Sequence, residues 1–315
     1  MRYRYLILFF LATVTSAFAQ THRNEIGLQT DNDAYLTRGS DRYYTNGFFL
    51  YYRHALNVAD SSSLKNKVFG IELGQKIFNA QSGSIPFSIF VDRPIAGYLY
   101  AGANLNLLYK NESNLKLGAQ IGMIGPASFA KEAQTLIHST FGLYPIAGWQ
   151  FQIKNAFQLN LSAEYNKLLA RASWIDLSVN TYANLGTGFT GAGAGPLLRL
   201  GNFNQLFNSE STQSSVSAKA IKTLHQSELF FYYKPLFNAV GYDATIQGGL
   251  FEDKSKPTTE VRGNLKPFIF SQEFGLTYVS SRWVFNVAVL TRGRETQFMV
   301  KPHQWGAVKV LYRFN

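Results

Sequence analysis

The chain of 315 residues carries a formal net charge of +11, with 16% charged residues, 15% aromatic residues and no cysteine. The charged share lies below the ~25% of an ordinary soluble domain, and the aromatic content is too high for a disordered chain. The absence of cysteine excludes a disulfide scaffold, and the basic residues are scattered rather than clustered, which gives no support for nucleic-acid binding.

The N-terminal segment has the composition of a secretory signal. Two arginines precede an apolar run over residues 5–14, and Ala-Phe-Ala follows at 17–19 as a small-residue cleavage site. The apolar run is about half of the ~20 residues that a membrane-spanning helix needs, so an uncleaved anchor is the less favoured interpretation. We therefore expect export, with residues 1–19 removed and residues 20–315 forming a single domain.

Apolar and polar residues then alternate with a period of two in one segment after another. The odd-numbered positions of 115–123 and 157–165 are apolar, while most even-numbered positions are polar or glycine. This alternation predicts strands with one apolar face and one polar face. A soluble sandwich or barrel would bury the apolar face, whereas a transmembrane barrel would turn it to lipid and line its lumen with the polar side chains.

Several features favour the transmembrane barrel. The predicted strands are long, turns separate them along the whole chain, and many apolar faces end in Tyr, Trp or Phe, as at a membrane interface. The chain also ends on a strand with Phe314 in the penultimate position, which looks like an outer-membrane assembly signal, although a terminal aromatic would match better than Asn315. We therefore predict an all-β, antiparallel transmembrane barrel in the outer membrane.

We predict about twelve strands, since single-chain bacterial barrels have an even number. Residues 240–251 could form a thirteenth strand and are assigned to a loop for that reason. With both termini in the periplasm, connections after odd-numbered strands lie on the outer side, where we expect the longer loops. The predicted strands span 23–31, 44–54, 67–78, 95–109, 114–124, 155–168, 172–187, 189–200, 227–239, 268–280, 282–293 and 305–314.

Acidic and amide residues gather in the first predicted outer loop, residues 32–43. Asp31, Asn32 and Asp33 open this region, and Asp41 lies near its end. Such residues are common in turns for conformational reasons. Oxygen ligands at this density also suit a hard cation such as calcium, so the pattern alone leaves both interpretations open.

The third predicted outer loop contains a segment of helical composition, residues 128–141, with Ser128 as its expected N-cap. Gln134 and His138 are four residues apart, so their side chains would share one helix face. His138 could be a general base near neutral pH or an exposed loop histidine without a function. Because the helix starts on the same side of the membrane as Asp33, the two could converge.

Two basic residues, Lys76 and Arg93, lie near the predicted outer rim. They could be solvated charges, or they could hold an anionic lipid headgroup. The sequence contains no serine-hydrolase elbow, no zinc-protease motif and no phosphate-binding loop. Serine-based catalysis therefore has no support.

An ordered set of short motifs resembles the family of outer-membrane lipid A 3′-O-deacylases. The resemblance runs through the first half of the chain. Its most specific part is the segment from Gln134 to His138. The set comprises Asn32-Asp33, Tyr44-Thr45-Asn46-Gly47, Asp92-Arg93-Pro94, Ile124-Gly125-Pro126, Gln134-Thr135-Leu136-Ile137-His138 and Gly148-Trp149. A glutamate that family members often carry shortly after the histidine has no counterpart here.

The resemblance implies a twelve-stranded barrel that removes the 3′-linked acyloxyacyl group of lipid A near the outer surface. It implies His138 as the general base, with Gln134, Asn32 and Thr45 orienting the histidine, the water or the substrate. It also implies Asp33 as a ligand of calcium. We expect a monomer that binds lipid A of lipopolysaccharide in the outer leaflet, with its basic charge complementing the lipid A phosphates.

The main alternative is a non-enzymatic barrel, such as a pore or a structural protein, that has the family fold without the activity. An outer-membrane phospholipase is a further alternative, but it would need a serine nucleophile beside a histidine and an asparagine. No such arrangement can be placed in this sequence.

Overall fold

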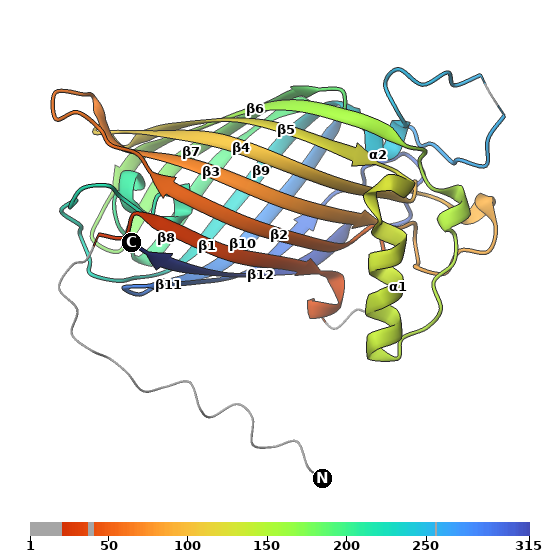
Figure 1. The fold of residues 1–315 in the computed structure, drawn as a ribbon, viewed down its shortest axis with the longest axis horizontal. Coiled ribbons are helices and arrows are strands. Elements are labelled where there is room, and N and C mark those ends of the chain that lie inside the picture. Colours follow the sequence, from red (N-terminus) through yellow and green to blue (C-terminus); the bar gives the residue numbers. More distant parts are fainter. Residues whose placement is uncertain (1–20, 37–40, 256) are drawn as a thin grey trace, which may run out of the picture.

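The computed structural model describes residues 21–36, 41–255 and 257–315. The predicted signal segment, residues 1–19, lies outside the described residues. The described part of the chain forms a closed barrel of twelve antiparallel strands (Figure 1). The predicted fold class and strand number are therefore confirmed.

Each strand pairs with its neighbours in sequence, and the first strand pairs with the last to close the barrel. This arrangement leaves no open sheet edge, which is what a membrane-spanning sheet requires. The strands are β1 (Asn24–Asn32), β2 (Tyr44–Ala55), β3 (Leu64–Phe78), β4 (Ala96–Tyr109), β5 (Ser113–Ile124), β6 (Ala156–Arg171), β7 (Ile175–Gly186), β8 (Phe189–Asn202), β9 (Glu228–Asp243), β10 (Phe268–Val279), β11 (Trp283–Arg292) and β12 (His303–Phe314).

The outer wall of the barrel is apolar, and the inner wall is polar. In β1, Ile26 and Leu28 are 53% and 51% exposed, whereas Glu25 is fully buried in the interior. The same alternation places Leu117 and Ile121 of β5 on the outside. The apolar face of each strand is thus turned to lipid, as the period of two predicts.

The region after β9 differs in detail from the prediction. β9 extends to Asp243, four residues beyond its predicted end, and a short helix, α2 (Ala244–Gln247), follows directly. Residues 240–251 therefore do not form a thirteenth strand. The side chain of Asp243 begins this helix by accepting a hydrogen bond from the backbone N–H of Thr245 at 2.8 Å.

The predicted helix in the third outer connection is α1 (Ala130–Phe141). Its expected N-cap is wrong, because Ser128 belongs to a preceding turn and its hydroxyl donates to the carbonyl oxygen of Gly125. Phe129, in a left-handed conformation with φ 55°, leads directly into the helix. Among the described residues, no helix is both long and apolar enough to cross a membrane.

α1 crosses the strand ends on the outside of the barrel, at the end opposite the C-terminus (Figure 1). Gln75 follows the lipid-facing residues of β3, and its side-chain amide donates to the carbonyl oxygen of Ser128 at 2.6 Å. Gly97 of β4 faces the same side, where a Cβ would collide with Ser128 and Ala130. The start of α1 is therefore held against the outer wall, where only a glycine permits so close an approach.

The expectation that all longer loops lie on the outer side is wrong for one connection. Residues 203–227, between β8 and β9, lie at the end of the barrel that holds the C-terminus (Figure 1). Six short 3₁₀ turns complete the structure: η1 (Asp33–Leu36), η2 (Ser88–Phe90), η3 (Pro126–Ser128), η4 (Trp149–Phe151), η5 (Leu206–Asn208) and η6 (Glu210–Thr212), counted over the described residues.

Candidate active site on the lipid-facing rim

Two asparagines occupy lipid-facing positions at the outer rim. Asn32 continues the outward series of Ile26 and Leu28 in β1, and it is paired in register with Asn46 of β2. The side-chain amide of Asn32 donates to the side-chain oxygen of Asn46 at 2.7 Å. Polar groups therefore appear on the outer wall just where the apolar strip ends.

A pair of carboxylates adjoins these amides. The hydroxyl of Thr45 lies 3.2 Å from Oδ1 of Asp33 and 3.0 Å from Oδ1 of Asp41. The other oxygen of Asp33 accepts a hydrogen bond from the backbone N–H of Arg42 at 3.1 Å. Asn46 joins this group by donating from its amide to the Thr45 hydroxyl at 3.2 Å. The first outer loop thus contributes two carboxylates, and the start of β2 contributes one hydroxyl and an amide, to one small site.

His138 of α1 completes the site from above the rim. Its Nε2 lies 2.8 Å from Oδ2 of Asp41, and its Nδ1 lies 2.7 Å from the carbonyl oxygen of Tyr144. A carbonyl can only accept, so Nδ1 must carry a proton. The hydroxyl of Tyr144 donates to Asp41, which fixes this carboxylate beside the histidine.

Gln134 lies one helical turn before His138 and is completely buried. Its Oε1 accepts a hydrogen bond from the indole N–H of Trp149 at 3.0 Å. Because an indole can only donate, this contact fixes which end of the amide is the oxygen. Nε2 has no partner among the described residues. A buried donor without an acceptor costs free energy, so this N–H is suited to donate to a bound ligand.

The electrostatics of the carboxylate pair favour an added positive charge. Burial raises the pKa of Asp33 to about 6, and the neighbouring carboxylate of Asp41 adds to the rise. Among the described residues no group of three or more His, Cys, Asp or Glu is arranged to hold a metal ion. The oxygens of Asp33, Asp41 and Thr45 nevertheless have the chemistry that calcium prefers. They fit such an ion as part of a ligand set.

The backbone of the first loop is strained beside the site. Asp41 and Tyr43 adopt left-handed conformations, with φ of 43° and 60°. Such conformations cost roughly 1–3 kcal/mol each in residues other than glycine. Tyr43 is held by hydrogen bonds between its backbone and Ala80 and Asn79, at 3.1 and 2.8 Å. The strained backbone thus lies directly beside the carboxylate that contacts His138.

Arg93 is not available to a lipid headgroup. Its side chain is fully buried and ion-paired with Glu295 at 2.8 Å, and it also donates to Thr245 at 3.0 Å. The guanidinium lies 4.2 Å from the ring of Phe78. Burial alone would raise the pKa of Glu295, but the charges of Arg93 and Arg292 lower it to about 2. Arg93 therefore ties outer loops together, and its guanidinium faces these loops instead of the surface on which a headgroup would lie.

We expect Arg93→Ala to destabilise the outer loops by about 1–3 kcal/mol, because Glu295 would lose its buried partner Arg93 and keep only the ion pair with Arg292. The measurement is the temperature at which the folded barrel loses its compact mobility on unboiled gels. Arg294→Ala, which removes an exposed charge next to Glu295, should leave this temperature unchanged. Equal behaviour of the two variants would contradict the structural role of Arg93.

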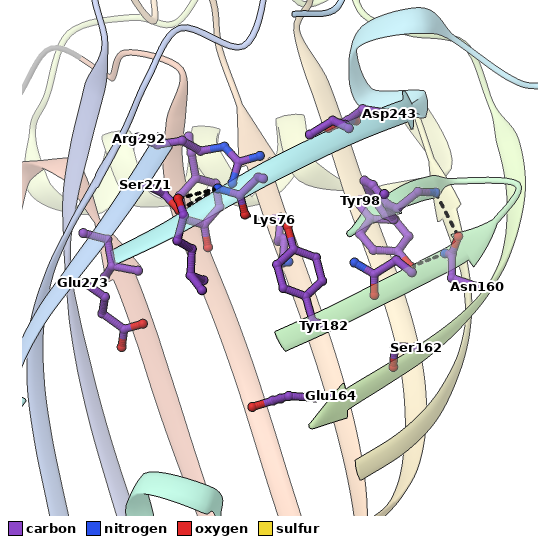
Figure 2. A pocket seen from close by; sticks show the side chains of 18 of the residues that line it. Lys76, Tyr98, Asn160, Ser162, Glu164, Tyr182, Asp243, Ser271, Glu273 and Arg292 are labelled. Atoms are coloured by element: carbon purple, nitrogen blue, oxygen red, sulfur yellow. Dashed lines mark hydrogen bonds between the residues drawn. The ribbon is translucent and has the colours of Figure 1, made fainter. Parts of the chain in front are cut away.

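Lys76 also differs from its predicted place. Ile71 and Leu73 of β3 face lipid, so the even-numbered Lys76 points into the lumen. Its ammonium lies 5.9 Å from the ring of Phe49 and 5.8 Å from that of Tyr100. Figure 2 shows Lys76 among the side chains of a luminal cavity of about 650 Å³. The barrel wall separates Lys76 from the site on the outer rim, so it does not hold a headgroup there.

The structure brings together most of the predicted site residues, namely Asn32, Asp33, Thr45 and His138, while Gln134 lies beside His138 on α1. It adds three contacts that the sequence did not predict: those of Asp41 and Tyr144 with His138, and that of Trp149 with Gln134. Asp41, from the first outer loop, provides an acidic neighbour for the histidine.

The closed barrel, its apolar outer wall and the polar site at its rim define an integral β-barrel protein of the outer-membrane type. The family model described as "Outer membrane protein LpxR" matches residues 6–314. The chain belongs to this family. A comparison with curated protein sequences gives no match.

Solved structures agree on the fold. LpxR from Salmonella typhimurium is similar with a TM-score of 0.74 and 21% identity, over 92% of this chain and 100% of that chain. The β domain of the Bordetella autotransporter BrkA is similar with a TM-score of 0.50 and 10% identity, over 94% of this chain and 100% of that one. At these identities the likeness is one of fold.

Proposed function

We propose that this protein is an outer-membrane lipid A deacylase that hydrolyses the 3′-linked acyloxyacyl ester. The observation that carries the proposal is the position of the site. A histidine, two carboxylates and two amides lie on the lipid-facing side of the rim, between the barrel wall and α1. A substrate embedded in the outer leaflet could reach this site without leaving the membrane, whereas a soluble substrate would gain nothing from such a position.

The two ring nitrogens of His138 have the contacts expected of a general base before the substrate binds. Since Nδ1 carries the proton donated to Tyr144, the contact of Nε2 with Asp41 is a hydrogen bond when a second proton lies between them, on Nε2 or on the carboxyl group. When a water molecule replaces the Asp41 oxygen at Nε2, the neutral ring can take its proton. The water oxygen then bonds to the ester carbonyl carbon, the bond to the sugar oxygen breaks, and His138 returns the proton to that oxygen.

The carbonyl oxygen needs donors as its negative charge develops. Nε2 of Gln134, which has no partner in the described part of the chain, is such a donor on the same helix as His138. A fixed donor of this kind stabilises an oxyanion. Asp33, Asp41 and Thr45 would hold a calcium ion. That ion would supply positive charge near the carbonyl.

The proposal is tested by mass spectrometry of lipid A from cells with and without the gene. Cells that express the protein should contain lipid A lighter by one acyloxyacyl group. An unchanged lipid A population, together with ion conductance by the purified protein, would instead favour the pore.

We expect Trp149→Phe to lower the hydrolysis rate about tenfold, because one hydrogen bond of about 1–1.5 kcal/mol no longer fixes the Gln134 amide. The phenylalanine ring keeps most of the buried packing around position 149. The measurement is the initial rate of acyl release in detergent micelles. Trp283→Phe, on the lipid-facing side of β11, is the matched control and should match the unmodified protein. Equal rates in the two variants would show that Trp149 does not position Gln134.

A further inference from the structure

The connection between β8 and β9 folds back into the barrel instead of forming an ordinary periplasmic turn. Its first part, residues 203–217, is termed the luminal plug here. Although the plug consists mainly of Ser, Asn, Gln and Thr, most of it is buried, and Leu206, Ser209 and Ser214 are completely inaccessible. A polar segment can be buried to this extent only if the barrel wall satisfies its hydrogen bonds.

The plug is bound to the seam where the barrel closes. Glu210 forms an ion pair with Arg53 of β2 at 3.3 Å, and the Ser215 hydroxyl donates to Glu25 of β1 at 2.6 Å. Arg313 of β12 donates to the carbonyl oxygen of Ser215 at 2.8 Å. The first, second and last strands therefore hold the same short stretch of chain.

The neighbouring strands hold the plug through its backbone. The amide of Asn66 in β3 donates to the carbonyl oxygens of Val216 at 2.8 Å and Phe207 at 3.1 Å. In β4, Asn106 donates to the carbonyl oxygen of Thr212 at 2.7 Å. Two luminal asparagines thus satisfy plug carbonyls that water would otherwise solvate.

A buried arginine fixes the opposite side of the plug. Arg199 of β8 is fully buried and ion-paired with Asp176 of β7. The same guanidinium donates to the hydroxyls of Ser209 and Ser211, both at 2.9 Å, and to the carbonyl oxygen of Asn204 at 3.1 Å. The plug is therefore anchored around the circumference of the barrel.

Apolar contacts add to these polar ones. Phe207 and Val216 of the plug form a buried cluster with Ala55, Val68 and Leu108 of the inner wall. These three wall residues belong to β2, β3 and β4. Their position opposite the two apolar plug residues shows that wall and plug are complementary.

Above the plug the lumen contains two cavities. A cavity of about 160 Å³ lies directly against plug residues 210–213, and the cavity of about 650 Å³ is lined by residues from the outer half of the barrel. Side chains such as Lys116, Glu164 and Asn166 line the smaller cavity. Without the plug, this polar interior would adjoin the periplasm directly.

We propose that the luminal plug is a fixed seal that prevents the barrel from conducting ions and small solutes. The seal is independent of the proposed hydrolysis, because the candidate active site lies on the outside of the wall. It is static rather than gated, since its anchors come from both sides of the barrel seam and from the opposite wall. Opening it would require many buried hydrogen bonds to break together.

The test is ion conductance of the purified full-length protein in planar lipid bilayers. The comparison is with a variant that lacks residues 204–224, in which a short hairpin would join β8 to β9. The unmodified protein should show no conductance steps, and the deletion should produce them. Lys222→Gln, an exposed position in the same connection, is the control and should remain silent.

Conductance by the unmodified protein would overturn the proposal. Absence of conductance in a folded deletion variant would overturn it too, because another part of the barrel would then block the lumen. If the deletion does not fold, the variant Asn66→Ala with Glu210→Ala removes anchors while keeping the chain intact, and it should show conducting openings. Its silence would likewise overturn the proposal.

Discussion

His138→Ala should lower the rate of acyl release from lipid A by ~10²–10⁴-fold, the usual contribution of a general base. Among the described residues, the imidazole connects α1 to the carboxylates of the first loop through its contact with Asp41. The measurement is the initial rate in mixed micelles of detergent and lipid A.

The matched control for this variant is Ser139→Ala on the exposed face of the same helix, which should retain full activity. Both variants should show the folded mobility on unboiled gels, since neither residue contributes to the barrel wall. Full activity of a folded His138→Ala variant would remove the histidine from the mechanism.

Asp33→Asn should lower the rate by ~10²-fold, the order of effect seen when a group that stabilises an oxyanion is lost. The amide preserves the shape of the side chain but removes the charge that would hold a cation beside Thr45. A chelator should lower the activity of the unmodified protein to a similar extent, and calcium should restore it. In the variant, the chelator should have little further effect, because both changes remove the same interaction.

Asp60→Asn is the control for this loss of charge, since Asp60 is exposed and pairs with Lys219 outside the site. It should retain activity and chelator sensitivity. If the unmodified protein were insensitive to chelation, the proposed cation site would be wrong, while the role of His138 would still stand.

The barrel could be predicted from the sequence because the pattern that specifies each strand lies within that strand. Each strand carries its own alternation, so residues such as Leu117 and Ile121 reveal the lipid-facing side without knowledge of their partners. The same alternation predicts that Lys76 points into the lumen, because its even number places it on the opposite face of β3 from Ile71 and Leu73. Nearness to the rim alone does not give the face of the strand on which a side chain lies.

Other features depend on contacts between distant parts of the chain. The partner of Arg93 is Glu295, 202 residues further along, and Tyr144 meets Asp41 across 103 residues. Nothing near Arg93 distinguishes a buried ion pair from an exposed charge. The sequence could therefore suggest the members of the site but not the pairing of Asp41 with His138.

The luminal plug shows a different limit. Its composition, rich in serine and asparagine, is typical of an exposed loop, and no local pattern states whether a connection folds outwards or into the lumen. The relevant signal is spread over the inner wall, in polar residues such as Asn66, Asn106 and Arg199 that donate hydrogen bonds to the plug. Only the closed barrel brings them together.

The central claim is that the rim site hydrolyses one particular ester of lipid A. It is tested most directly by incubating the purified protein with lipid A in micelles and locating the lost group by tandem mass spectrometry. The account predicts loss of the 3′-linked acyloxyacyl group, with one oxygen from ¹⁸O-labelled water in the released acid. Intact lipid A, or loss of a different acyl group, would contradict it.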